Sequence, residues 1–146
     1  MARPATTGRA LVRTPVMLPC STRSVRDARA WVRTDLASSA LPREVVEDAL
    51  LVVSELVSNS LRHARRLPGD RIGLAWWWHD RSVTVEVTDG GGSSFPVARL
   101  PATSAIGGRG LAMVAAVSAD WGVDRSPAET TVWAVLGDPD GGGGRR

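Results

Sequence analysis

Apolar residues recur at intervals of three or four over two long segments, which is the spacing of amphipathic helices. The first segment, 24–37, begins with Ser24-Val25-Arg26-Asp27, which has the spacing of a capping box and predicts Ser24 as the cap. The second begins at Pro42, a residue suited to the first position of a helix, and is predicted to end near His63. Its predicted core stripe consists of Val46, Leu50, Val53, Val57 and Ala64.

Short apolar runs and period-two alternation predict strands in the rest of the chain. Two of them, 72–78 and 83–88, lie close enough in sequence to form a hairpin. A loop rich in glycine, serine and proline is expected over 90–108, and a short helix follows it. The predicted strands cover 10–18 (a loose or edge strand), 72–78, 83–88, 119–123 and 130–136.

This order of elements predicts an α+β fold. We expect a two-layer sandwich, in which helices pack on one face of a mixed, mostly antiparallel sheet. With 146 residues the chain is long enough for one domain with a proper core. We expect an N-terminal arm with a short strand (1–20), a globular domain (20–136) and a disordered, glycine-rich tail (137–146).

Composition excludes several classes of function. All 18 basic residues are arginine, and the absence of lysine excludes a Walker A loop, a eukaryotic-type kinase site and Schiff-base chemistry. The net charge is +3, but the arginines are spread along the chain, so no nucleic-acid binding is expected. No apolar run approaches the roughly 20 residues of a membrane span, and no secretory signal is apparent. We therefore expect a cytoplasmic protein without a membrane partner.

Three polar residues lie opposite the predicted core stripe of the second helix. At about 100° per residue, Glu55, Asn59 and Arg62 fall on one side, flanked by Leu51 and Val52. Their apolar neighbours indicate the floor of a pocket, although Glu and Asn at this spacing also occur on many exposed helices. Mg²⁺ prefers oxygen ligands, of which the protein usually supplies one or two. Asn59 is thus a candidate metal ligand, Glu55 a proton acceptor and Arg62 a phosphate partner.

Two glycine-containing segments provide further candidates. Asp89 follows an alternating strand and precedes glycines. It is either a turn initiator or a carboxylate that accepts a hydrogen bond from the exocyclic amine of a flat ring. Gly107-Gly108-Arg109-Gly110-Leu111 opens the predicted short helix. Backbone N–H groups at such a position attract anions, but a plain flexible helix entry has the same sequence features.

These elements, in this order, resemble the Bergerat-fold (GHKL) ATPases, the superfamily of gyrase and histidine kinases. Glu55-Leu-Val-Ser-Asn59-Ser-Leu-Arg62-His63-Ala64 is similar to the N-box of the family. Asp89-Gly-Gly91 and Gly108-Arg-Gly110-Leu111 are similar to its two glycine boxes. Thr130-Thr131-Val132-Trp133 is similar to its closing strand motif, in which a threonine helps to hold the adenine.

Within this superfamily the chain is most similar to small standalone anti-sigma factors and their serine-kinase relatives. The resemblance implies Glu55 as catalytic base, Asn59 as the Mg²⁺ ligand and Asp89 on the adenine amine. It implies ATP and Mg²⁺ as cofactors. As partners it implies a sigma factor and a STAS-type anti-anti-sigma protein whose serine is phosphorylated. The residues expected around the nucleotide are Asn59, Arg62, His63, Asp89, Gly91, Gly108, Arg109, Gly110, Leu111 and Thr130.

The leading hypothesis is therefore an ATP-dependent protein serine kinase that acts as a regulatory switch. The alternative is a non-catalytic module, in which ATP only orders a loop so that a partner can dock. The presence of Glu55 favours the kinase. The catalytic domain of a sensor histidine kinase is not expected, because His63 and His79 are the only histidines and neither lies in a dimerising helix pair.

Trp76-Trp77-Trp78 cannot all point to one side of a strand, because successive side chains alternate between the two faces. Both faces of the sheet are thus expected to carry aromatic residues. One face is expected to be covered by helices. The other is covered either by a partner, such as a second subunit in a homodimer, or by neighbouring loops.

Overall fold

The computed structural model describes residues 15–92 and 108–141, and parts of the predicted arm, glycine-rich loop and tail lie outside these ranges. The elements follow the predicted order. None of the described helices is long and apolar enough to span a membrane. The elements are β1 (Val16–Pro19), α1 (Arg23–Leu36), α2 (Arg43–His63), β2 (Arg71–His79), β3 (Ser82–Asp89), α3 (Gly108–Val117), β4 (Asp120–Arg125) and β5 (Thr130–Gly137).

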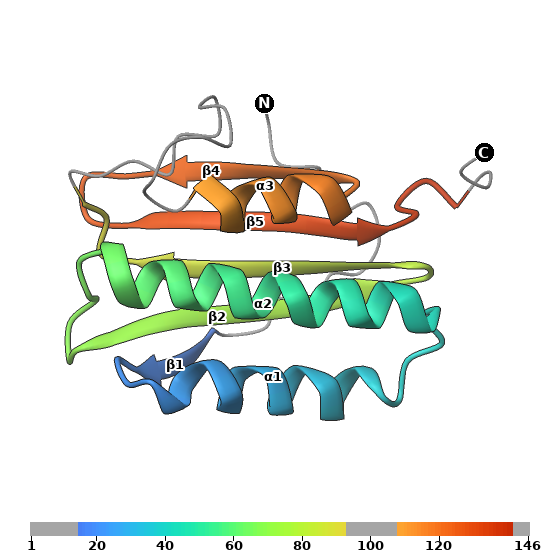
Figure 1. The fold of residues 1–146 in the computed structure, drawn as a ribbon, viewed down its shortest axis with the longest axis horizontal. Coiled ribbons are helices and arrows are strands. Elements are labelled where there is room, and N and C mark those ends of the chain that lie inside the picture. The colour runs from blue at the N-terminus through green and yellow to red at the C-terminus, as the bar shows by residue number, and fades with distance from the viewer. Residues whose placement is uncertain (1–14, 93–107, 142–146) are drawn as a thin grey trace.

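The five strands form one sheet in the order β1-β2-β3-β5-β4. Every neighbouring pair of these strands is antiparallel, so the sheet is wholly antiparallel where a mixed one was allowed for. All three described helices lie on one face of the sheet (Figure 1). The predicted two-layer α+β architecture is confirmed. The strand before the first helix is the edge strand β1, which is one of the two alternatives predicted, and β5 ends at Gly137, one residue beyond the predicted end of that strand.

The core lies between the helices and the sheet, and α2 occupies its centre. This helix contacts α1, α3 and the sheet strands β2, β3 and β5. Its buried face is therefore wider than the predicted stripe, whose end members Val46 and Ala64 are only partly buried. The buried residues of α2 are Ala49, Leu50, Val52, Val53, Leu56, Val57 and Ser60.

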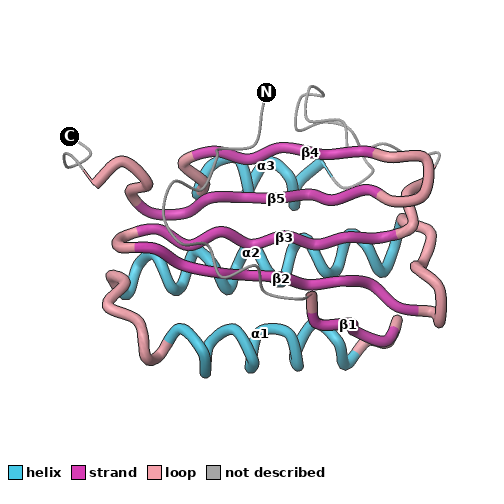
Figure 2. The backbone as a smooth tube through the Cα atoms, turned by 180° about the vertical axis from the view of Figure 1, so that it is seen from behind, coloured by secondary structure: helices cyan, strands magenta, loops and turns pink. Residues whose placement is uncertain are grey.

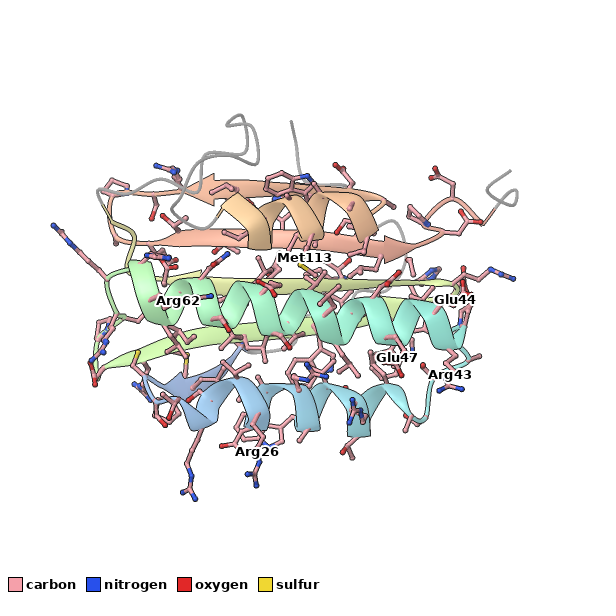
Figure 3. The ribbon with its side chains drawn as sticks, viewed as in Figure 1. Arg26, Arg43, Glu44, Glu47, Arg62 and Met113 are labelled. Atoms are coloured by element: carbon pink, nitrogen blue, oxygen red, sulfur yellow. The ribbon has the colours of Figure 1, made fainter. Side chains whose placement is uncertain are left out.

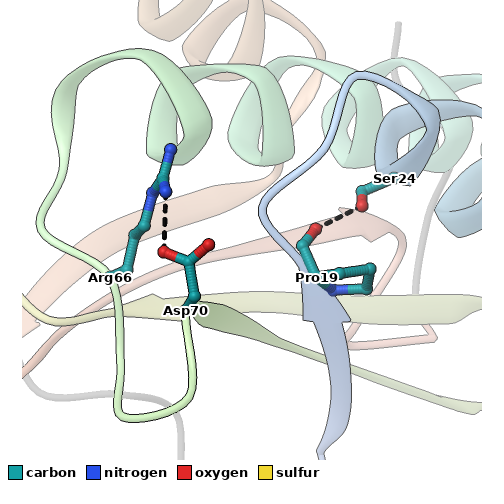
Figure 4. A network of polar contacts seen from close by, with 4 residues as sticks. All are labelled: Pro19, Ser24, Arg66 and Asp70. Carbon is teal, nitrogen blue, oxygen red and sulfur yellow. Dashed lines mark hydrogen bonds and ion pairs between the residues drawn. The ribbon is translucent and has the colours of Figure 1, made fainter.

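The predicted capping box at Ser24 is wrong. The helix α1 begins at Arg23, so Ser24 lies in its first turn, and its hydroxyl donates a hydrogen bond to the carbonyl of Pro19. That carbonyl ends strand β1, and the bond ties the edge strand to the helix that follows it (Figure 4). The same view shows the exposed ion pair of Arg66 and Asp70, which braces the turn before β2 at 2.6 Å.

The three consecutive tryptophans are divided between the two faces of the sheet, as predicted. Trp76 is buried in the core beneath the helices, and Trp78 packs against the same core. Trp77, between them, points to the opposite face. The indole Nε1 of Trp76 donates a hydrogen bond of 2.7 Å to Oδ2 of Asp35 in the last turn of α1. This bond fixes the end of α1 to the centre of the sheet.

Replacing Asp35 by alanine should lower the free energy of unfolding by about 1–2 kcal/mol, because the buried indole N–H loses its acceptor. Chemical denaturation followed by circular dichroism measures this change. Asp27→Ala is the matched control, because Asp27 lies exposed on the same helix. Equal effects of the two substitutions would contradict a stabilising role for the bond.

Candidate functional site

The structure brings the polar face of α2 against the opening turn of α3. A Cβ atom added to Gly110 would lie 2.6 Å from Oε2 of Glu55 and 3.2 Å from Nδ2 of Asn59. A side chain at this position would therefore displace the ends of the Glu55 and Asn59 side chains from their present positions. Two motifs that are far apart in the sequence thus meet at Glu55, Asn59 and Gly110.

Glu55 and Asn59 are both half-buried, in line with the expectation drawn from the apolar residues that flank them on α2. They lie one turn apart on the same face of α2, so their side-chain oxygens can contact the same small ligand or ion. A carboxylate and a carboxamide together supply oxygen donors with a single negative charge. This arrangement suits a cation that is shared with an anionic ligand.

Asp89 ends β3 and is 6% exposed. Its Oδ2 accepts a hydrogen bond of 2.8 Å from the Ser60 hydroxyl, and its Oδ1 accepts one of 2.8 Å from the backbone N–H of Gly91. Burial raises the pKa of Asp89, and the hydrogen bonds from Gly91 and Ser60 and the charge of Arg125 partly offset that rise. The carboxylate therefore initiates a turn, as one interpretation of the sequence had it, and is also fixed to α2.

Thr130 and Gly91 lie beside Asp89. Thr130 begins β5 as the register partner of Asp89 and is buried. Gly91 has a φ of 74°, and a Cβ atom on it would lie 3.4 Å from Oγ1 of Thr130. The end of β3, the start of β5, the end of α2 and the start of α3 all lie at the left of Figure 1. We call Glu55, Asn59, Asp89, Gly110 and Thr130 the polar cluster.

The sequence patterns did not predict the contacts that link the end of α2 to Asp89 at the end of β3. Ser60 is buried and donates to Asp89, and a signal was present, because it lies seven residues after Val53 on the core face of α2. The backbone of Arg65 also exchanges two hydrogen bonds of 2.7 Å with Gly90 and Gly91. A Cβ atom on Gly90 would lie 2.6 Å from the Arg66 carbonyl oxygen. No local pattern predicts this pairing.

The remaining predicted site residues lie in different surroundings. Arg62 is exposed (Figure 3), and its Nε donates a 3.3 Å hydrogen bond to the Ser58 carbonyl of its own helix. His63 is exposed at the end of α2. Leu111 packs in the hydrophobic core. Gly108 and Arg109 form the first turn of α3, and the Arg109 side chain lies outside the described part of the chain.

A separate hollow lies at the other end of α2, where Figure 3 labels Glu44. Its lining includes four carboxylate residues and one arginine, Arg81. Such a surplus of negative charge repels a polyphosphate, so this hollow does not suit a nucleotide. The carboxylate residues are Glu44, Asp48, Asp138 and Asp140.

Comparison with solved structures places this fold among known domains. The RsbU and RsbW domains of Rv1364c from Mycobacterium tuberculosis match with a TM-score of 0.59 and 22% identity, over 87% of this chain and 34% of that chain. The histidine kinase domain of the blue-light activated histidine kinase EL346 from Erythrobacter litoralis matches with a TM-score of 0.50 and 21% identity, over 78% of this chain and 59% of that chain. The chain thus spans about a third of the first neighbour and three fifths of the second.

The family comparison covers most of the chain. No curated protein matches it. The model of the histidine kinase-like ATPase domain matches residues 18–136, which include every motif that resembled the Bergerat-fold ATPases. The resemblance is confirmed at the level of the family, which is a family of nucleotide-binding domains. The chain therefore belongs to the histidine kinase-like ATPase domain family.

Proposed function

We propose that this protein binds Mg²⁺-ATP in the polar cluster and acts as an anti-sigma factor with protein serine kinase activity toward a STAS-type anti-anti-sigma partner. The observation that carries the proposal is the contact of Gly110 with Glu55 and Asn59. It sets a carboxylate and a carboxamide beside the N-terminal turn of a ten-residue helix. The N–H groups of that turn have no partners within the helix and attract anions such as phosphate.

The adenine is assigned to Asp89, Gly91 and Thr130. An exocyclic amine donates hydrogen bonds, and Asp89 offers carboxylate oxygens whose orientation is fixed by Ser60 and Gly91. Gly90 and Gly91 have no side chains to hold a flat ring away from the backbone. Thr130 adds a hydroxyl next to Gly91. Together they favour a base that carries an amine over one that carries a carbonyl at the same position.

The donor set fits a Mg²⁺ ion that arrives with the nucleotide. Within the described residues no group of three or more His, Cys, Asp or Glu side chains could hold a metal. Mg²⁺ commonly takes one or two protein oxygens and completes its shell with phosphates and water. The carboxamide oxygen of Asn59 is suited to be that ligand, since it adds no charge that repels phosphate. When bound, the ion neutralises phosphate charge.

Glu55 is assigned the proton transfer. Its carboxylate accepts the proton of a partner serine hydroxyl while the serine oxygen forms a bond to the γ-phosphorus. The bond from that phosphorus to the β–γ bridging oxygen breaks, and ADP leaves with the electron pair. Glu55 is half-buried beside the N-terminal turn of α3, so an incoming hydroxyl can reach its carboxylate.

The second candidate is a nucleotide-gated binding module without transfer activity. Both candidates require the same nucleotide site, and Glu55 favours the kinase because binding alone does not need a base. The fold that this chain shares with a protein containing an RsbW domain also supports a regulatory role. A sigma factor and an anti-anti-sigma protein are the proposed partners, and a homodimer is a further proposed state.

Asn59→Ala should weaken Mg²⁺-dependent ATP binding at least tenfold, which corresponds to about 1.4 kcal/mol, because the ion loses its protein ligand. Isothermal titration calorimetry with and without Mg²⁺ measures this difference. Glu47→Ala is the control, since Glu47 is exposed nearer the other end of α2 (Figure 3). Unchanged affinity in the Asn59 variant would remove this residue from the site.

Glu55→Gln should retain ATP affinity within about twofold but lose phosphoryl transfer by about a hundredfold or more, because a general base contributes on that order. Transfer of labelled phosphate to a STAS-type protein is the measurement, with Glu47→Gln as the matched carboxylate-to-amide control. A fully active Glu55 variant would rule out its role as the base. A wild-type protein that binds ATP and the partner without any transfer would establish the binding module instead.

As the pH is lowered, ATP affinity should begin to fall at a higher pH than it would if Asp89 had the pKa of an ordinary aspartate. Burial raises the pKa of Asp89, so this side chain takes up a proton at a higher pH and then becomes a weaker acceptor. Titrations between about pH 7.5 and pH 5 should show this decline in the wild type and not in Asp89→Asn. The same variant should lose preference for ATP over GTP. Parallel pH profiles, or an undiminished preference, would contradict the assignment.

A further inference from the structure

The sheet face opposite the helices is the one turned toward the viewer in Figure 2, and it carries three deeply buried apolar side chains. Ala75, Trp133 and Val135 point to this side, because their neighbours Trp76, Val132 and Ala134 face the helical core. We call this side the open face, since no described helix or strand lies on it. Yet Ala75 is 7%, Trp133 1% and Val135 4% exposed. Side chains on a bare sheet face do not reach such values, and no described helix or strand accounts for them.

Trp133 is the largest and least exposed of these three residues. Its indole lies across Gly122 of the neighbouring strand β4, where an added Cβ atom would be 2.6 Å from Cζ2 of the ring. Its Nε1 is buried and has no hydrogen-bond partner among residues 15–92 and 108–141. A buried indole N–H normally finds an acceptor, and a backbone carbonyl of a covering segment can supply one.

The chain enters the described fold on this same face. Pro15 is the first described residue, and its Cβ lies 3.6 Å from the position of a Cβ on Gly73. Met17 lies on the same side of Gly73, with its sulfur 3.8 Å from that position. Gly73 is two residues before Ala75 on β2, so it belongs to the open face. The segment 1–14 is therefore joined to the described fold, through Pro15, on the open face.

Length permits these residues to reach Trp133. The step from Gly73 to Trp133 crosses two strand spacings and two residues along the strands, which amounts to about 12 Å. Leu11 precedes Pro15 by four residues, which span about 13 Å in extended form. An extended segment would thus be long enough to bring the apolar run 10–12 to the indole.

Charge is complementary as well. The open face carries the carboxylates of Glu86 on β3 and of Asp120 and Asp124 on β4, because these residues share the side-chain direction of Trp133 and Gly122. Residues 1–14 contain no Asp or Glu. They do contain three arginines, Arg3, Arg9 and Arg13. The three arginines can pair with these three carboxylates, of which Glu86 lies between Ala75 and Trp133 in the register of the sheet.

We propose that residues 1–14 dock across the open face of the sheet, with the apolar run 10–12 over Trp133 and the arginines beside the carboxylates of β3 and β4. The open face is then an intramolecular interface. A second copy of the chain or a partner protein has to displace the arm before it can use this surface. The proposal does not depend on the function assigned to the polar cluster.

Paramagnetic relaxation measures the docking directly. The experiment uses the full chain with Cys20→Ser and Leu11→Cys. A spin label on residue 11 should reduce the NMR signal intensities of the Trp133 indole and of the Gly122 and Val135 amides by at least half. The same label on Ala112→Cys, which is exposed on the helical side, should leave these signals unchanged. Unaffected signals with the label at residue 11 would overturn the proposal. Broadening seen only between a labelled molecule and a second, isotope-labelled molecule would also overturn it, in favour of a dimer.

Hydrogen exchange gives an independent readout without a label. Leu11→Ser with Val12→Ser should speed exchange of the Trp133 indole proton at least tenfold, because the apolar cover is lost. Thr6→Ser with Thr7→Ser is the matched control in the same arm and should leave exchange unchanged. Equal protection in both double variants would show that the run 10–12 does not cover Trp133.

Discussion

Helix α2 has to satisfy two physical demands at once, and the remaining elements are arranged around it. It packs between α1, α3 and the sheet, and seven of its 21 residues are buried. Apolar burial of this kind is the main source of stability for a small domain. The same helix must leave Glu55 and Asn59 half-buried. The absence of a side chain at Gly110 allows α3 to complete the packing and keep those oxygens accessible.

Beside these two residues, the end of α2 also takes part in polar contacts that are costly to bury. Asp89 is an anion in a largely dry position, and burial raises its pKa. It is retained because the Ser60 hydroxyl and the Gly91 N–H each donate a hydrogen bond to one of its oxygens, which leaves further acceptor positions on both oxygens. The backbone pairing of Arg65 with the glycines holds the same junction. The end of α2 and the ends of β3 and β5 are thereby fixed relative to one another, which is the preorganisation that a binding site requires.

Local periodicity was sufficient for the elements themselves, because side-chain direction repeats with the backbone geometry. It correctly predicted α2, the hairpin β2–β3 and the edge strand. It failed where a distant group decides the outcome. The Ser24 hydroxyl bonds to the Pro19 carbonyl and does not cap α1, and the choice depends on where β1 ends. Val46 and Ala64 are less buried than predicted, because the width of the buried face of α2 depends on α1 and α3.

The candidate site shows the same division. Residue types and their order indicated Glu55, Asn59 and Asp89, because each has chemistry suited to a nucleotide. The contact of Gly110 with Glu55 and the bond from Ser60 to Asp89 join elements that are 55 and 29 residues apart, and no local pattern encodes such pairings. Arg62 illustrates the opposite case, since its helical position allowed a role in the site while its side chain bonds to its own helix.

The central claim is that the polar cluster is the nucleotide site. Titration of the isotope-labelled protein with Mg²⁺ and a non-hydrolysable ATP analogue tests it most directly. The account predicts that the largest chemical-shift changes occur at Gly91, Gly110, Thr130 and the Asn59 side-chain amide. Changes centred instead on the acidic hollow around Glu44 and Asp138, or no saturable change at all, would contradict it.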